Sequence, residues 1–277
     1  MTERPTILLT GATDGLGHAL AQRLAAEGAR LLLHGRDPDK LASVAEQLHR
    51  EHGERPHTAV ADMAELAQVR ELAQTVRGAT DRLDVLISNA GIGASGPGGR
   101  ERTTSVDGHE LRFAVNYLAG FLLTLELLPL LRETGRAGGR PSRVVNVASA
   151  GQQALDFDDL MLRHDYRGGR AYCQSKLAQI MSGFTLAELL PADEVVVNSL
   201  HPATYMPTKI VTAERIDSIE DGVRATRRLA VDGELAGVTG RYFDRTSESR
   251  AHEQAYDPRA RAALWERSLE LTGHPGS

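Results

Sequence analysis

The sequence predicts an α/β fold in which one domain is built around a doubly wound parallel β-sheet of about seven strands. Short unbroken apolar runs alternate with longer amphipathic segments, which is the pattern of βαβ units whose strands are buried on both faces. No change in composition marks a linker, and no internal repeat is visible. We therefore treat residues 1–277 as one domain.

The first half of the chain contains four expected strands, at residues 7–10, 31–33, 58–60 and 85–87. Helices are expected between them at residues 18–27, from 38 to about 52, and at 65–76. The second helix has the clearest start, because Asp37 suits an N-cap and Pro38 suits the first helical position.

The second half is expected to continue the same alternation. A long apolar helix surrounds Asn116, and a Gly/Arg-rich loop at residues 133–143 leads to a strand at 144–147. A helix at 171–190 and strands at 195–197 and 242–243 follow. We expect residues 203–222 to form a lid over a substrate and residues 245–277 to form a C-terminal extension.

Composition limits the partners and the compartment. The 32 basic and 37 acidic side chains give a formal net charge of −5 without a run of like charges, which argues against nucleic acid or an anionic membrane. Cys173 is the only cysteine, and the first ten residues lack the regions of a signal peptide. Neither His-Glu pair has the second histidine of a zinc-protease motif. We expect a cytoplasmic protein that binds a small molecule and no metal.

The stretch from Phe113 to Leu131 is almost long and apolar enough to span a membrane. It contains Asn116, Glu126 and Pro129, and the mean hydropathy of the whole chain is −0.29. These features favour a buried helix with one face on the core and another available to a second subunit.

Three glycines, Gly11, Gly15 and Gly17, lie at the expected turn from the first strand into the first helix. At such a turn the backbone can pass close to a pyrophosphate, and the helix N-terminus presents N–H groups and a partial positive charge. A glycine-rich turn alone can also be a tight connection, but its place between a strand and a helix favours a dinucleotide site.

The end of the second strand indicates which dinucleotide binds, since NAD sites use a carboxylate there and NADP sites use a cation. Gly35 occupies the position where the acid is usual, and Arg36 follows with a guanidinium suited to phosphate. Asp37 is explained as a helix cap. The sequence predicts a preference for NADP(H) and leaves NAD(H) open.

Tyr172 and Lys176 stand four residues apart in an expected helix and so share one face. A tyrosine with its ordinary pKa of about 10 is a poor proton carrier at neutral pH, and an adjacent ammonium stabilises its phenolate. The pair therefore predicts a tyrosine that transfers a proton.

Several motifs occur together in one order along the chain. They are Thr10-Gly11-x-x-x-Gly15-x-Gly17, Asp62, Asn89-Ala90-Gly91, Asn116, Ser149 and Tyr172-x-x-Ser175-Lys176. In this combination the chain resembles a short-chain dehydrogenase/reductase over nearly its whole length, which implies one Rossmann-fold domain. Residues 155–160, 171–178 and 240–243 further resemble the branch that contains retinol dehydrogenases and protochlorophyllide-reductase-like enzymes.

The resemblance implies catalytic roles. Tyr172 would protonate a carbonyl oxygen as hydride reaches the carbon, and Ser149 would hydrogen-bond the same oxygen. Lys176 would lower the tyrosine pKa and hold the nicotinamide ribose, and Asn116 would anchor a water that links Lys176 to solvent. Taken singly, Asn116 could also be a helix kink satisfied internally, and Ser149 a strand-end hydroxyl.

The resemblance also implies two sets of contacts. The cofactor would contact Gly11, Thr13, Asp14, Gly15, Leu16, Gly17, Arg36, Asp62, Met63, Asn89, Ala90, Gly91, Tyr172, Lys176, Pro202, Thr204 and Thr208. The substrate would contact Ser149, Gly151, Tyr172, Tyr205 and Met206.

Some of these assignments leave alternatives open. Asn89 could instead tie strands together, and Tyr205 and Met206 could be ordinary packing residues. Ala203 replaces the family's glycine after Pro202. Which of Thr204 and Thr208 meets the cofactor is therefore left open.

The sequence thus predicts an NADP(H)-dependent oxidoreductase. It would reduce a ketone or aldehyde on a hydrophobic small molecule, or oxidise the corresponding alcohol. The alternatives are a C=C reductase of the same fold and a non-catalytic NADP-binding regulator. A homodimer or homotetramer is left open, and the substrate's identity is not predicted.

Overall fold

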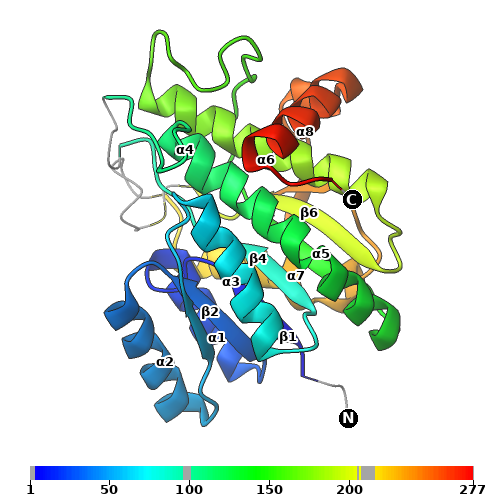
Figure 1. Cartoon of the computed structure of the whole chain (residues 1–277). Helices are drawn as coiled ribbons and strands as arrows, with labels where there is room; N and C mark the ends of the chain where they lie inside the picture. The colour runs from blue at the N-terminus through cyan, green and yellow to red at the C-terminus, as the bar shows by residue number, and fades with distance from the viewer. Residues whose placement is uncertain (1–3, 96–100, 205, 207–215, 277) are drawn as a thin grey trace.

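The computed structural model describes residues 4–95, 101–204, 206 and 216–276. Its centre is one eight-stranded sheet in the order β3-β2-β1-β4-β5-β6-β7-β8 (Figure 1). The first seven strands are parallel, as predicted, and β8 pairs antiparallel with β7. The strands are β1 (Thr6–Leu9), β2 (Arg30–Gly35), β3 (His57–Val60), β4 (Val85–Ser88), β5 (Ser142–Val147), β6 (Val195–His201), β7 (Arg241–Asp244) and β8 (Ser247–Ser249).

Helices cover both faces of the sheet and form two apolar cores with it. One core joins the sheet to α1 (Gly15–Ala26), α2 (Pro38–His52) and α7 (Ile219–Val231). The other joins it to α3 (Leu66–Ala79), α5 (Ala119–Gly138), α6 (Gly168–Leu189) and α8 (Pro258–Thr272). The strand order reverses between β1 and β4, and in such sheets ligands bind beyond the carboxyl ends of the strands at that point.

The predicted loop at residues 133–143 is wrong, because α5 continues to Gly138 and β5 begins at Ser142. The helix is extended by contacts that the local composition does not reveal. A Cβ at Gly135 would lie 2.0 Å from the Glu194 carbonyl oxygen, so the glycine permits close packing. Arg132 and Arg136 both pair with the Glu194 carboxylate.

The long apolar segment is helical throughout, from α4 (Leu111–Phe113) through a π-helical turn at Ala114–Leu118 into α5. By length and composition alone it could cross a membrane, and 78% of its most apolar stretch is buried inside the fold.

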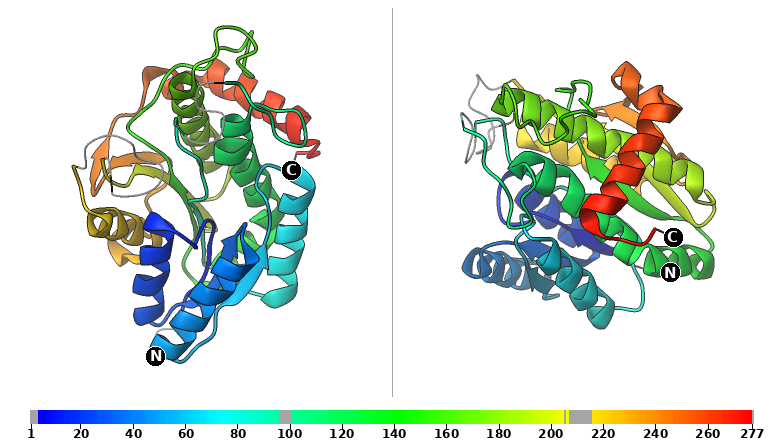
Figure 2. Two further views of the ribbon diagram at one scale, coloured as in Figure 1. Left: turned by 90° about the vertical axis from the view of Figure 1, so that its left-hand side faces the viewer. Right: turned by 45° about the horizontal axis from the view of Figure 1, so that its top comes forward.

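The C-terminal helix α8 crosses over this segment and α6 (Figure 2). The Trp265 ring of α8 meets Phe121 edge-on at 5.1 Å, and Ser268 shares a buried hydrogen bond of 2.6 Å with Tyr117. This helix, which the sequence analysis did not predict within residues 245–277, covers part of the face expected for a second subunit.

Candidate active site

The glycine-rich turn between β1 and α1 is shaped by backbone contacts. Helix α1 begins at Gly15, three residues earlier than predicted, and the Asp14 side chain caps it by accepting from the Gly15 N–H at 2.9 Å. Gly11 and Gly15 have φ values of +69° and +50°, in the left-handed region that favours glycine. A Cβ at Gly17 would lie 2.0 Å from the Gly11 carbonyl oxygen. The turn therefore folds directly onto the first turn of the helix.

Asn89 ties the ends of β1 and β4 together. Its Nδ2 donates to the carbonyl oxygens of Thr10 and Gly11, at 2.9 and 3.2 Å. In return, Thr10 Oγ1 accepts from the N–H groups of Asn89 and Ala90, at 2.9 and 3.0 Å. Of the two alternatives for Asn89, this geometry supports the structural tie.

His34 on β2 is a site residue that the sequence analysis missed. Its Nδ1 accepts from the Gly11 N–H at 3.2 Å, and its Nε2 lies 3.0 Å from the Ala61 carbonyl oxygen, to which it donates. Burial lowers the pKa of His34, so the ring is neutral and can accept at Nδ1. The side chain thus joins the glycine-rich turn to the segment that carries Asp62. The only signal in the sequence is one histidine in an otherwise apolar strand.

The end of β2 has no carboxylate facing the turn. A Cβ at Gly35 would lie 2.6 Å from Thr13 Cγ2, which leaves no room for an acidic side chain. The Asp37 carboxylate accepts from the N–H groups of Asp39 and Lys40, both at 3.1 Å, and so caps α2 as expected. Arg36 is exposed at this point.

The segment after β3 carries two of the predicted cofactor contacts. Asp62 is half-buried, and its Oδ1 accepts from the Ala64 N–H at 2.9 Å, which fixes a turn. Met63 is buried in the apolar core. Both residues lie next to Ala61, the acceptor of the His34 bond.

Ser149, Gly151 and Tyr172 come together at the carboxyl end of β5. Ser149 follows the strand and Tyr172 lies on α6, and the two side chains lie near each other beside Gly151. Ser149 Oγ also accepts from the Gly151 N–H at 3.0 Å. A Cβ at Gly151 would lie 3.8 Å from Tyr172 Cε1, so this glycine packs directly beside the phenol ring.

Burial shifts the pKa values of both members of the pair on α6. Burial raises the pKa of Tyr172, and the Ser149 hydroxyl acts in the opposite direction. Burial also lowers the pKa of Lys176 to about 8. Lys176 Nζ donates to the Val147 carbonyl oxygen at 2.8 Å and to Gln179 Oε1 at 3.3 Å. Of the groups around Tyr172, Ser149 opposes the effect of burial on the tyrosine pKa.

Asn116 lies in the π-helical turn, and its side chain binds two elements. Its Oδ1 accepts from the Ile92 N–H at 2.7 Å, and its Nδ2 donates to the Ile92 carbonyl oxygen at 3.1 Å and to Ser175 Oγ at 3.0 Å. Gly91 lies beside it, because a Cβ there would be 3.1 Å from Asn116 Oδ1 and 3.7 Å from Lys176 Nζ. The amide thus brings the loop after β4 against α6, in agreement with the internally satisfied kink.

The segment after β6 is only partly described. Pro202 is buried, and Thr204 Oγ1 lies 3.0 Å from both His201 Nε2 and Arg245 Nη2. The Thr204 hydroxyl is therefore engaged within the protein. Tyr205, Thr208 and in all half of the expected lid at residues 203–222 lie outside the described residues.

Met206 packs on the cofactor side of the sheet. A Cβ at Gly222 on α7 would lie 2.5 Å from the Met206 sulfur. The Met206 side chain also packs against the apolar core that contains Leu16. Of the two alternatives for Met206, this placement supports ordinary packing.

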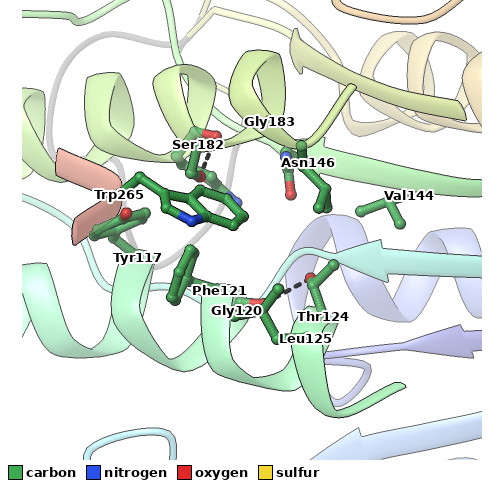
Figure 3. Close-up of a pocket in the computed structure, with 12 residues that line it drawn as sticks. Tyr117, Gly120, Phe121, Thr124, Leu125, Val144, Asn146, Ser182, Gly183 and Trp265 are labelled. Carbon is green, nitrogen blue, oxygen red and sulfur yellow. Dashed lines mark hydrogen bonds between the residues drawn. The ribbon is translucent and has the colours of Figure 1, made fainter. Parts of the chain in front are cut away.

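A small cavity of about 20 Å³ lies between α5, α6 and α8. Figure 3 shows Trp265 reaching in from α8, with Val144 and Asn146 at the opposite end of the cavity. It is large enough for about one water molecule. Because neither Ser149 nor Tyr172 lines it, this cavity is separate from the cluster described above.

Comparison with known proteins identifies the family. The family model for short chain dehydrogenases matches residues 5–218. Human retinol dehydrogenase 13 is 33% identical over 292 residues, which cover 97% of this chain and 84% of the relative. A Streptomyces protein (strain C5), named as a daunorubicin C-13 ketoreductase, is 37% identical over 280 residues, covering 97% of this chain and 92% of the relative.

A solved structure of a short-chain dehydrogenase from Shigella flexneri 2a, in complex with NADP, has a TM-score of 0.69 and 27% identity. The match covers 87% of this chain and 96% of that one.

Proposed function

The chain belongs to the short-chain dehydrogenase family, in the branch of the retinol dehydrogenases, and we propose that it is an NADP(H)-dependent carbonyl reductase and alcohol dehydrogenase. The proposed substrate is a ketone or aldehyde on a hydrophobic small molecule, or the corresponding alcohol. The observation that carries the proposal is Tyr172, which lies beside Ser149 at the carboxyl end of β5 and one helical turn from Lys176. A protein that only binds a nucleotide has no need of this group.

The residues present fit a nicotinamide dinucleotide. Gly11 and Gly17 form a cradle that a Cβ at either position would fill. The cradle lies at the N-terminus of α1, where free N–H groups favour the binding of phosphate. We propose that this turn holds the pyrophosphate and that Asp62 and Met63 lie at the adenine. When bound, such a cofactor supplies or accepts the hydride.

The preference for NADP(H) is supported at the end of β2. Thr13 excludes an acidic side chain at Gly35, and Asp37 is committed to capping α2. Arg36 is then available for a ribose phosphate.

The proposed chemistry follows from the positions of three side chains. In the reductive direction Tyr172 gives its proton to the carbonyl oxygen, and Ser149 Oγ donates a hydrogen bond to the same oxygen. With a pKa of about 8, Lys176 is mostly protonated at neutral pH. We propose that its Nζ, close to Gly91, holds the cofactor's ribose and so keeps the reacting carbon near Tyr172.

A hydrophobic substrate is supported by two observations. Gly151 leaves the side of the Tyr172 ring uncovered by a side chain at that position. The relatives are named for retinol and for daunorubicin, which are both bulky molecules with large apolar parts. We infer the same class of substrate for this chain.

The test is NADPH consumption with a panel of hydrophobic aldehydes and ketones, comparing the wild type with Tyr172→Phe. We expect the wild type to turn over and the variant to lose at least about a hundredfold in kcat. NADPH binding, followed by fluorescence, should be retained in both forms.

Two results would favour the alternatives. Binding of NADPH without turnover in either form would indicate a regulator. A saturated carbonyl product instead of an alcohol, identified by mass spectrometry, would indicate reduction of a C=C bond.

A further inference from the structure

The segment that follows Ser149 is held by residues from the far end of the chain. We call residues 149–155 the Ser149 loop; within it no helix or strand is formed. The family model matches only residues 5–218, yet most of the side chains that fix this loop from outside come after that range. They belong to β7 and to the segment that leads into α8.

Tyr242 on β7 fixes the first residue of the loop. Its hydroxyl donates to the Ser149 carbonyl oxygen at 3.1 Å, and the same oxygen accepts from Gln152 Nε2 at 3.0 Å. Tyr242 is 4% exposed, and burial raises the pKa of its phenol, so the hydroxyl remains a donor. This bond sets the main chain of Ser149, whose Oγ lies near Tyr172 beside Gly151.

Gln254 fixes the last residue of the loop. Its Oε1 accepts from the Leu155 N–H at 2.6 Å, and its Nε2 donates to the Leu155 carbonyl oxygen at 3.1 Å. The neighbouring His252 N–H donates to Gln152 Oε1 at 2.7 Å. Residues 252–254 thus hold the loop at two points.

From these contacts we propose that Tyr242 and Gln254 are positioning residues for the reaction. They hold the Ser149 loop so that Ser149 Oγ stays against the hydroxyl of Tyr172. This inference rests on the proposed function and adds the C-terminal segment to its machinery. On the α6 side the loop is held by Gln174, which donates to the Ala154 carbonyl oxygen at 2.6 Å and does not contact Ser149.

The physical basis is the short distance at which Ser149 Oγ has to act on Tyr172 and on the substrate oxygen. A hydrogen bond weakens steeply outside about 3 Å, and a displacement of about 1 Å at a reacting group can cost a hundredfold in rate. A loop without secondary structure gains no such precision from its own main chain. Two anchors, one at each end, supply it.

The test compares Tyr242→Phe and Gln254→Leu with Ser268→Ala as a matched control. Ser268 also makes a buried hydrogen bond in the C-terminal segment, but its partners, Tyr117 and Leu264, lie outside the Ser149 loop. All three variants lose a polar contact of similar kind. Only the first two should affect the loop.

We expect kcat to fall between about tenfold and a hundredfold in Tyr242→Phe and Gln254→Leu, with the Kd for NADPH unchanged. The rate of alcohol oxidation should also reach its plateau at higher pH in these variants. The reason is that the Ser149 hydroxyl lowers the pKa of Tyr172, and a displaced serine no longer does so. Amide hydrogen exchange in residues 149–155 should accelerate in both.

Unchanged kcat and pH profile, even with faster exchange in the loop, would overturn the proposal and leave a purely structural clamp. An equal loss of kcat in Ser268→Ala would also overturn it. Failure of the proposed function looks different, because the wild type itself would then not turn over any carbonyl compound in the panel.

Discussion

Close backbone packing shapes the glycine-rich turn of the cofactor half, with Asn89 and His34 tying it in place, whereas hydrogen bonds from side chains hold the Ser149 loop of the substrate half. On the cofactor side, Gly11 and Gly17 pack so closely that no Cβ fits between them. On the substrate side, Ser149 is placed by Tyr242 and, through the loop, by Gln254. A side chain at Gly11 or Gly17 would clash with the neighbouring backbone, so these two positions cannot be substituted. Tyr242 and Gln254 act through hydrogen bonds, which other side chains can also form.

The two ways of holding the site suit two different tasks, which are cofactor binding and substrate recognition. Every member of a cofactor-dependent family has to bind the pyrophosphate of its dinucleotide, which suits a fixed backbone cradle. The substrate side has to differ between enzymes, and loops held by exchangeable side chains permit that. The two halves meet at Tyr172 and Lys176 on α6.

The largest expected effect concerns the cradle. Gly17→Ala should lower the free energy of unfolding by at least about 3 kcal/mol, because the new Cβ would overlap the Gly11 carbonyl oxygen. It should also weaken NADPH binding. Urea unfolding and fluorescence titration measure the two effects.

Gly78→Ala is the control for this substitution. Gly78 lies in α3 with nothing within 4 Å of its Cβ position, so the change should stabilise the protein by about 0.5–1 kcal/mol. Equal effects of the two substitutions would contradict the steric account.

The next effect concerns the C-terminal region. Trp265→Ala should lower the free energy of unfolding by about 2 kcal/mol, because the half-buried indole packs against Phe121. The affinity for NADPH should not change, since the cradle lies on the other side of the sheet. Loss of NADPH affinity comparable to the loss in Gly17→Ala would show that the two halves are not independent.

The parts of the molecule that the sequence predicts correctly depend on local patterns. The apolar runs of β1, β4 and β5 and the cap at Asp37 are visible within a few residues, and the structure confirms them. The roles given to Ser149, Tyr172 and Lys176 stay predictions, although the structure brings these residues close together.

The parts that were missed depend on pairs of distant residues. Nothing near Gly135 indicates that Glu194 lies against it, and nothing near Ser149 indicates Tyr242. A hydrogen bond between residues about a hundred positions apart leaves no period in the sequence. The end of α5 and the Ser149 clamp could therefore not be predicted.

A smaller effect is a pH dependence that originates in the cofactor half. His34 is buried and neutral, so its pKa in the folded protein lies below the unfolded value of about 6.5, although the nearby Asp62 partly opposes this. The unfolded chain binds a proton below that pH and the folded protein does not, so stability falls as pH falls. Between pH 7 and pH 5 the loss from one such histidine can reach at most about 2 kcal/mol, the limit for a ring that stays neutral in the folded protein.

His34→Gln tests this account, because an amide can replace both hydrogen bonds without titrating. Urea unfolding from pH 7 to pH 5 should show a weaker pH dependence in the variant. A residual slope is expected, because burial also lowers the pKa of His201. An identical slope in the two proteins would show that His34 does not titrate as described.

The smallest effect concerns Arg36, whose exposed side chain is the proposed contact for the ribose phosphate. Arg36→Ala should weaken NADPH binding about fivefold, or about 1 kcal/mol, because an exposed ion pair is partly screened by water and salt. NADH has no phosphate for the guanidinium, so its affinity should not change. Arg50→Ala, on the exposed end of α2, serves as the charge-matched control. If Arg36→Ala weakened both dinucleotides equally, Arg36 would contribute general electrostatics, and the preference for NADP(H) would need another source.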